Sequence, residues 1–95
     1  MENPFGESAL CVEGIPDGDW QSLRDQLAAE GWTLQRGGGL DHSWARLSKD
    51  ALEIHMEYDI WREGWVGFPS RRKADILAAL PDWFVRTHGS LWGPA

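Results

Sequence analysis

Four polar side chains occupy every second position of one short segment, and their types could do acid–base or metal chemistry. They are Glu53, His55, Glu57 and Asp59. Side chains two residues apart on a β-strand share one face, so an imidazole would lie among carboxylates that exchange protons with it or ligate a metal ion. The same alternation is typical of any strand with one face in water, and no zinc-type spacing such as His-Glu-x-x-His accompanies it. We therefore expect no metal site here.

Tryptophan residues interleave with these charges on the same predicted face. Large, stiff rings surrounded by polar groups are typical anchors of binding surfaces, because they bury much area at little cost in entropy. In the alternative interpretation the face is structural and is covered by the N-terminal arm, by the C-terminal tail or by a second copy that dimerises through two of the tryptophans, Trp61 and Trp65. The predicted partner-binding surface consists of Trp44, His55, Glu57, Asp59, Trp61 and Trp65.

One basic cluster opens a predicted helix, and its members are Ser70, Arg71, Arg72 and Lys73. Three cations at a helix N-terminus oppose the helix dipole, and a bound anion would offset that repulsion. Free backbone N–H groups and guanidinium groups could converge there on a phosphate or a carboxylate. The cluster is therefore a candidate anion site. The other interpretation is that these side chains pair with acidic residues elsewhere or point into water.

The chain carries no catalytic motif that would add a reaction to these sites. The run of three glycines at residues 37–39 has neither the Walker spacing nor the dinucleotide fingerprint. Residues 41–43 are Asp-His-Ser, the residue types of a hydrolase triad, but triad partners meet through the fold and not as chain neighbours. The sequence thus provides no catalytic residue and no cofactor site, and it weighs against an enzyme without excluding one.

Length, charge and cysteine content bound the class of protein. The chain has 95 residues, the size of one domain, and a net charge of −6 with a pI near 4.8. Such a surface repels phosphate backbones and anionic lipids, so we expect neither sequence-specific nucleic-acid binding nor a membrane partner. The single cysteine, Cys11, cannot form an internal disulfide, and the first eight residues lack the pattern of a secretory signal. These features predict a cytoplasmic protein.

The spacing of apolar residues predicts the elements that position the candidate sites. Residues 9–15 and 32–36 have the composition of strands, and the helix between them carries Trp20, Leu23 and Leu27 on one face. Further strands begin near His42, and a final helix after Pro69 is broken or bent at Pro81. The first strand either pairs in parallel with a central strand or closes an edge of the sheet.

Side-chain parity predicts the register of two hairpins. A two-residue turn at residues 49–50 would place Leu47 opposite Leu52 and Arg46 opposite Glu53. Apolar residues then meet on one face and charged residues on the other.

The second predicted hairpin turns through a three-residue loop at residues 62–64, with Gly64 at a position of positive φ. This loop would place Ile60 opposite Val66 on the core face and Trp61 opposite Trp65 on the outer face. A tryptophan pair would then stand beside the carboxylates.

Together these elements predict an α+β fold, with a mainly antiparallel sheet of four to five strands in the order β-α-β-β-β-β-α and helices packed on one face. We expect residues 1–8 to form a flexible N-terminal arm, residues 9–89 the single domain, and residues 90–95 a C-terminal tail. The predicted core consists of Leu10, Val12, Trp20, Leu23, Leu27, Leu34, Leu47, Ile54, Met56, Tyr58, Val66, Phe68, Ile76, Leu77 and Leu80.

The functional hypothesis is a small acidic module that binds, and inhibits or shields, a basic partner protein through its aromatic and carboxylate-rich sheet face. Opposite charge would steer the encounter, and burial of the rings would hold the complex. The alternative is a ligand-binding or enzymatic domain in which Arg71, Arg72 and Lys73 grip an anion while His55 or His42 does proton chemistry. Such a pocket could be built between subunits of an oligomer.

Overall fold

Five antiparallel strands and three helices form one domain in the computed structural model, which describes residues 9–39 and 41–88. The predicted α+β class and element order are confirmed. The predicted arm at residues 1–8 and tail at residues 90–95 lie outside the described residues. The elements are β1 (Ala9–Ile15), α1 (Asp17–Ala29), β2 (Thr33–Gly38), β3 (His42–Lys49), β4 (Leu52–Asp59), β5 (Glu63–Pro69), the short 3-10 helix η1 (Ser70–Arg72), α2 (Lys73–Ala79) and α3 (Asp82–His88).

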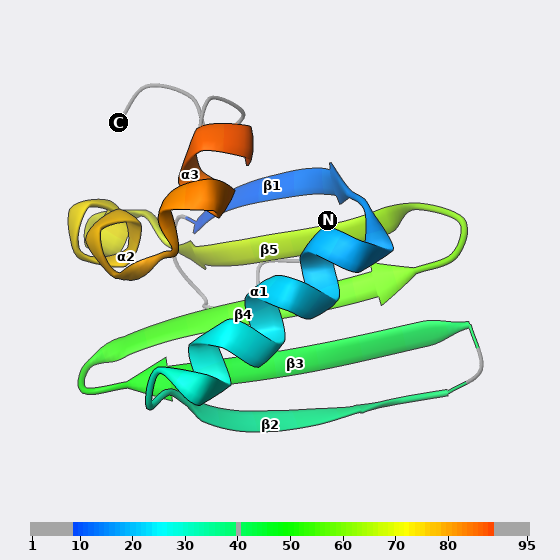
Figure 1. Ribbon diagram of the computed structural model, residues 1–95, viewed down its shortest axis with the longest axis horizontal. Helices are drawn as coiled ribbons and strands as arrows, with labels where there is room; N and C mark the ends of the chain where they lie inside the picture. The colour runs from blue at the N-terminus through cyan, green and yellow to red at the C-terminus, as the bar shows by residue number, and fades with distance from the viewer. Residues whose placement is uncertain (1–8, 40, 89–95) are drawn as a thin grey trace.

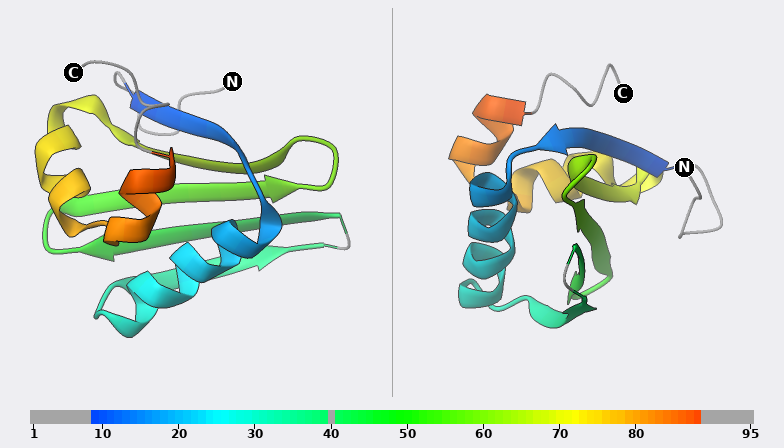
Figure 2. Two further views of the ribbon diagram at one scale, coloured as in Figure 1. Left: turned by 45° about the horizontal axis from the view of Figure 1, so that its top comes forward. Right: turned by 90° about the vertical axis from the view of Figure 1, so that its right-hand side faces the viewer.

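The strands follow the order β1-β5-β4-β3-β2, so β1 and β2 are the two edges (Figure 1). The sequence left the place of the first strand open, and the structure shows that it closes an edge, antiparallel to β5. Figure 2 shows α1 and α3 on the same side of the sheet, which makes two layers. The sheet face turned away from these helices is called the outer face below.

The core lies between the sheet and the helices. On α1, Trp20, Leu23 and Leu27 are buried, as the helical spacing predicts. Leu10, Leu34, Tyr58 and Leu77 belong to the predicted core but are only partly buried at its margin. The remaining predicted core residues are buried, and the core also takes in residues that were not predicted: Ile15, Trp32, Ala45 and Phe84.

The first hairpin register is shifted by two residues from the prediction. Lys49 pairs with Leu52 and Leu47 with Ile54, so the turn consists of residues 50–51. Asp50 has a φ of 55° and takes the left-handed position, which aspartate tolerates better than most residues. Because the shift is even, every side chain stays on its predicted face. The predicted pairing of Arg46 with Glu53 is nevertheless wrong, since Arg46 lies opposite His55.

The second hairpin is shifted by four residues. Asp59 pairs with Glu63, which leaves residues 60–62 as the loop, and Gly64 lies inside β5 rather than in the turn. Gly64 is needed there because Trp20 packs against it: a Cβ at this position would lie 2.6 Å from Cδ1 of Trp20 and 2.8 Å from the Ile15 carbonyl oxygen. The predicted burial of Ile60 is therefore wrong, and its side chain is 55% exposed.

The same shift separates two tryptophans that were predicted to pair. Trp65 lies opposite Glu57 on β4, whereas Trp61 lies in the loop. A tryptophan pair on the outer face is therefore also wrong.

The C-terminal helices follow the prediction in outline. Pro81 separates α2 from α3, and His88 near the end of α3 lies 3.0 Å (Nε2 to Oδ2) from Asp19 in the first turn of α1. This contact joins helices that are far apart in sequence. Within the described ranges, no helix is long and apolar enough to cross a membrane.

The contact between Trp20 and Gly64 predicts a strong and local sensitivity to substitution. We expect Gly64→Ala to lower the free energy of unfolding by about 2–3 kcal/mol, because the added methyl group meets a buried ring and a backbone carbonyl. Gly18→Ala is the matched control, since a Cβ there meets nothing within 4 Å and alanine favours the helix. Urea denaturation followed by circular dichroism measures both variants. Equal stabilities would contradict this packing.

Candidate functional site

The predicted binding face divides into a buried part and an exposed part. His55 and Trp65 are only 8% and 5% exposed, so neither is an accessible binding residue in the way the sequence suggested. Glu57 is exposed and Asp59 half-buried on the same face. Trp61, in the loop between β4 and β5, is 82% exposed. The accessible part of the predicted site is therefore gathered at the loop end of β4 and β5.

Trp44 is half-buried because its ring packs across the neighbouring strand. It lies opposite Gly37 in the pairing of β2 with β3, and a Cβ at residue 37 would lie 2.9 Å from the ring. The guanidinium of Arg46 lies over the ring, 5.8 Å from its centroid, which is within the distance of a cation–π contact. Trp44 is thus held between a glycine and an arginine at the β2 side of the sheet.

Trp65 packs in the same way against a glycine of its own strand. A Cβ at Gly67 would lie 2.8 Å from the ring of Trp65 and 3.3 Å from Sγ of Cys11. The indole N–H reaches no hydrogen-bond acceptor on nitrogen or oxygen within the described part of the chain, and the Cys11 sulfur is its polar neighbour. Burial raises the pKa of the Cys11 thiol; the Trp65 N–H lowers it, and the negative charge of Glu13 raises it further.

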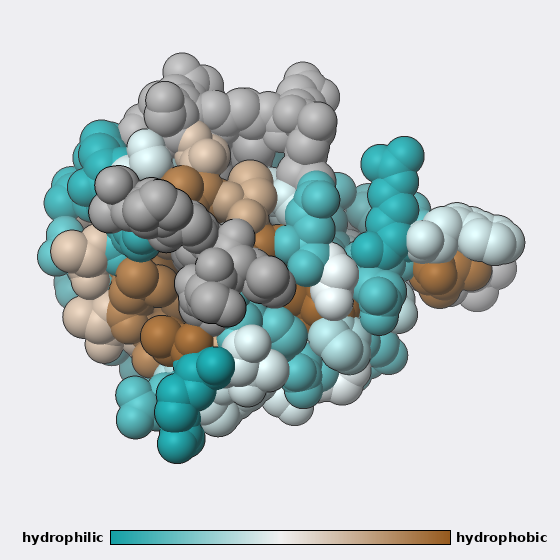
Figure 3. Space-filling view, turned by 90° about the horizontal axis from the view of Figure 1, so that it is seen from above, coloured by the Kyte–Doolittle hydropathy of each residue, from teal (hydrophilic) through white to brown (hydrophobic). Residues whose placement is uncertain are grey.

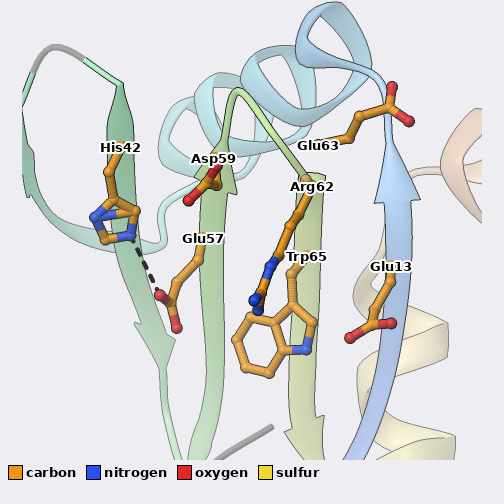
Figure 4. Close-up of a pocket in the computed structure, with 8 residues that line it drawn as sticks. Glu13, His42, Glu57, Asp59, Arg62, Glu63 and Trp65 are labelled. Carbon is orange, nitrogen blue, oxygen red and sulfur yellow. Dashed lines mark hydrogen bonds and ion pairs between the residues drawn. The ribbon is translucent and has the colours of Figure 1, made fainter.

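A hollow of about 340 Å³ opens at the loop end of the outer face (Figure 4). Four carboxylates line it, against the single guanidinium of Arg62. One of the four, Glu57, lies 3.3 Å (Oε1 to Nε2) from His42 on the neighbouring strand. The lining residues come from β1, β3, β4, β5 and the loop: Glu13, His42, Glu57, Asp59, Arg62, Glu63, Gly64 and Trp65.

Arg62 extends from the loop toward the Trp65 ring, inside this hollow (Figure 4). Its guanidinium forms no ion pair within 4.0 Å with any carboxylate of the described residues. The excess of negative charge in the hollow is therefore only partly compensated by the chain itself. The hollow suits a positively charged group better than an anion.

The loop between β4 and β5 carries two apolar residues in the chain between Asp59 and Arg62, which both line this hollow. In the described part of the chain, Ile60 and Trp61 are the large hydrophobic residues with high exposure. The loop backbone is held in place: the Trp61 N–H donates to Oδ1 of Asp59 at 2.7 Å, and the Ile60 N–H donates to the Asp41 carbonyl at 3.3 Å. Figure 3 shows this end of the sheet projecting from the right-hand side of the molecule, with brown hydrophobic surface next to teal side chains.

The histidines of the outer face are each paired with one carboxylate. His55 Nε2 lies 2.8 Å from Oε1 of Glu53, and His42 lies against Glu57 as described. Among the residues at 9–39 and 41–88, no three His, Cys, Asp or Glu side chains come together as metal ligands. The alternating polar residues of β4 thus form separate pairs and not one coordinated cluster.

The basic cluster lies far from the acidic hollow. Ser70, Arg71 and Arg72 form η1 and Lys73 begins α2, while Arg72 pairs with Asp75 at 3.6 Å. They follow β5, whose other end lines the hollow, and a seven-residue strand spans roughly 20 Å. The structure therefore does not bring the proposed anion site and His42 together. His55, the other proposed proton carrier, is buried against its own carboxylate partner.

Three charged residues of the hollow were not predicted as site residues. Glu13 enters because β1 lies beside β5, and Arg62 and Glu63 enter because the loop is displaced toward the N-terminus. The sequence carries a signal for Glu13, because a glycine follows it within the strand. Gly14 takes a φ of 70° in the irregular stretch between Val12 and Ile15.

Comparison with protein-family models, with curated proteins and with solved structures finds no significant match.

The surroundings of Cys11 predict its reactivity. We expect iodoacetamide to alkylate this thiol more slowly than a free cysteine at about pH 8, because burial raises its pKa and limits access. Glu13→Gln should raise the rate about twofold by removing a nearby negative charge. Glu30→Gln, at the end of α1, is the matched control and should leave the rate unchanged. Alkylation as fast as that of a free thiol would contradict the burial of Cys11.

Proposed function

We propose that this chain is a protein-binding module that docks a basic partner protein through the loop between β4 and β5 and the adjoining acidic hollow. The observation that carries this proposal is that exposed Ile60 and Trp61 lie in the loop that joins Asp59 to Arg62 and Glu63, and these three charged residues line the acidic hollow. An apolar anchor next to a charged recess is the arrangement expected of a recognition surface. The negative charge of the hollow favours a partner that presents lysine or arginine.

The two parts of this surface have different physical roles. The carboxylates, within a chain of net charge −6, attract a basic surface over several ångströms and raise the association rate. Burial of the Trp61 ring then supplies contact energy and slows dissociation. The partner's cationic side chains would enter the hollow near Glu57 and Glu63, where Arg62 leaves the negative charge in excess.

Within this proposal, His55, Trp44 and Trp65 support the surface and do not contact the partner. Two of them are almost fully buried, and the ring of Trp44 is packed between Gly37 and Arg46. Occupation of its basic surface would shield the partner from its other ligands, so inhibition is the expected consequence of binding. We propose that this happens in the cytoplasm, in line with the single cysteine.

Calorimetric titration with defined peptides tests this function. The peptides alternate arginine and lysine with leucine and tyrosine, and matched peptides carry glutamate in place of the basic residues. We expect Trp61→Ala to weaken binding of the basic peptides roughly tenfold, as removal of a central aromatic anchor does. Glu57→Gln combined with Glu63→Gln should weaken binding and flatten its dependence on salt, because fewer charges attract the peptide.

Glu30→Gln is the matched charge control, because Glu30 is exposed at the end of α1 and does not line the hollow. It should bind the basic peptides as the unaltered chain does. The proposal is wrong if the glutamate peptides bind as well as the basic ones, or if Trp61→Ala and the double variant leave the affinity unchanged.

A further inference from the structure

The strand β2 is an edge of the sheet, and no other strand of the described residues pairs with its outer side. Among residues 9–39 and 41–88 it pairs only with β3, and Figure 1 shows it as the lower border of the sheet, with no labelled helix or strand beyond it. An edge strand presents a row of backbone N–H and C=O groups that can pair with another strand. The open question is which groups are free and which strand they fit.

The register of the β2–β3 hairpin identifies the free backbone groups. The Gly39 N–H donates to the His42 carbonyl at 2.8 Å, so this pair is hydrogen-bonded. Hydrogen-bonded and non-bonded pairs alternate in an antiparallel ladder, so on β2 the residues 33, 35 and 37 bond to β3. The N–H and C=O groups of Leu34, Arg36 and Gly38 then point away from the sheet. Among the described residues, no hydrogen bond reaches these six groups.

The two edges of the sheet differ in their ability to accept a new strand. On β1, the register shifts between Val12 and Ile15, and Glu13 lies within the irregular stretch. Bulges and charges of this kind discourage edge pairing. The pairing of β2 is regular over all six residues, and this strand contains no proline. The edge that can accept a strand is therefore β2.

We propose that β2 pairs with β2 of a second copy of this chain, antiparallel and about a two-fold axis at Gln35. This register places Leu34 of each copy opposite Arg36 of the other, and the four backbone groups of each pair can bond. The stem of the arginine side chain then covers the half-buried Leu34. A register centred on Arg36 would instead set two guanidinium groups directly opposite each other, which is unfavourable.

The outer face supports the same register. Thr33 of one copy comes opposite Gly37 of the other, and the ring of Trp44 lies over that glycine. The threonine methyl group would therefore pack beside an indole that is half-buried in the single chain. Neither β2 nor β3 carries an acidic residue, so the carboxylates that give the chain its negative charge lie on other elements. A second copy can approach this edge without opposing rows of carboxylates.

The dimer leaves the acidic hollow open in both copies, because no residue of β2 lines it. The proposed pairing rests on the sheet edge alone and is independent of the proposed function. A short edge contact buries less than the roughly 1,200 Å² of a standard interface, so we expect a dissociation constant of about 100 µM.

Sedimentation velocity of the full chain tests this dimer. Concentrations from about 10 µM to about 1 mM extend below and above the expected dissociation constant. The average mass should rise from that of the 10.7 kDa monomer toward twice that value. Gln35→Lys and Gln35→Glu should each remain monomeric, because like charges would face each other across the axis. An equimolar mixture of the two variants should dimerise at least as strongly as the unaltered chain. No other register brings residue 35 opposite itself, so recovery in the mixture identifies the axis.

A backbone variant gives a second, independent test. Arg36→Pro removes an outward-facing N–H but no bond to β3, and proline is tolerated at such positions of edge strands. It should abolish dimerisation, whereas Arg36→Ala, which keeps the N–H, should still dimerise. Circular dichroism confirms that both variants fold. The proposal is overturned if the unaltered chain stays monomeric throughout, if each Gln35 variant dimerises by itself, or if a folded Arg36→Pro variant dimerises normally.

Discussion

The contact of Trp20 with Gly64 determines where the loop between β4 and β5, the proposed binding site, lies. The ring leaves no room for a side chain at that position, so the glycine must face α1 from within β5. The register of β5 against β4 follows, with Asp59 opposite Glu63, and residues 60–62 become the loop. The register predicted from the sequence would instead return Ile60 to the core face and place Trp61 on the outer face opposite Trp65. The packing of one helix residue in the core therefore decides that Trp61 lies in an exposed loop and not on a strand.

The same combination of tryptophan and glycine recurs twice on the outer face. There the packing over glycine makes the tryptophan rings themselves less accessible to solvent. Gly37 and Gly67 are the positions over which Trp44 and Trp65 lie, and each would place a Cβ less than 3 Å from the ring. Glycine in a strand loses stability through entropy and missing contacts, and an aromatic ring laid over it restores part of that loss. These two rings stabilise the sheet. They are thereby withdrawn from binding, which leaves Trp61 as the exposed ring of the predicted set.

Side-chain parity could be predicted from the sequence, but strand register could not. The alternation from Glu53 to Asp59 assigns each residue to a face with a period of two, and even shifts of register leave that assignment intact. The register depends on which residues accept a positive φ. Gly64 was the natural candidate, yet Glu63 takes that conformation at a φ of 62°. Nothing in the local sequence shows that a distant tryptophan requires the glycine elsewhere.

The hollow was harder to predict than the fold, because it is assembled across strands. Glu13 and Glu63 line the same hollow only after β1 is placed beside β5, and that placement depends on long-range packing. The burial of individual residues could not be predicted either. His55 and Glu57 follow the same alternation and lie on the same face, yet His55 is buried and Glu57 is exposed. Parity distinguishes the faces of a strand but not the parts of one face that neighbouring side chains cover.

Charge is distributed so that self-association and partner binding would use different parts of the sheet. All the carboxylates of the strands lie on β1, β4 and β5, while the cations of β2 and β3 include Arg36 and Arg46. The proposed basic partner would therefore be attracted to the loop end, where two copies of this chain would repel each other. The uncovered edge lies on the other side, where backbone groups rather than charges specify the contact. A pair of chains joined there would present two acidic hollows, and a partner with two basic sites would bind such a pair more tightly than one chain alone.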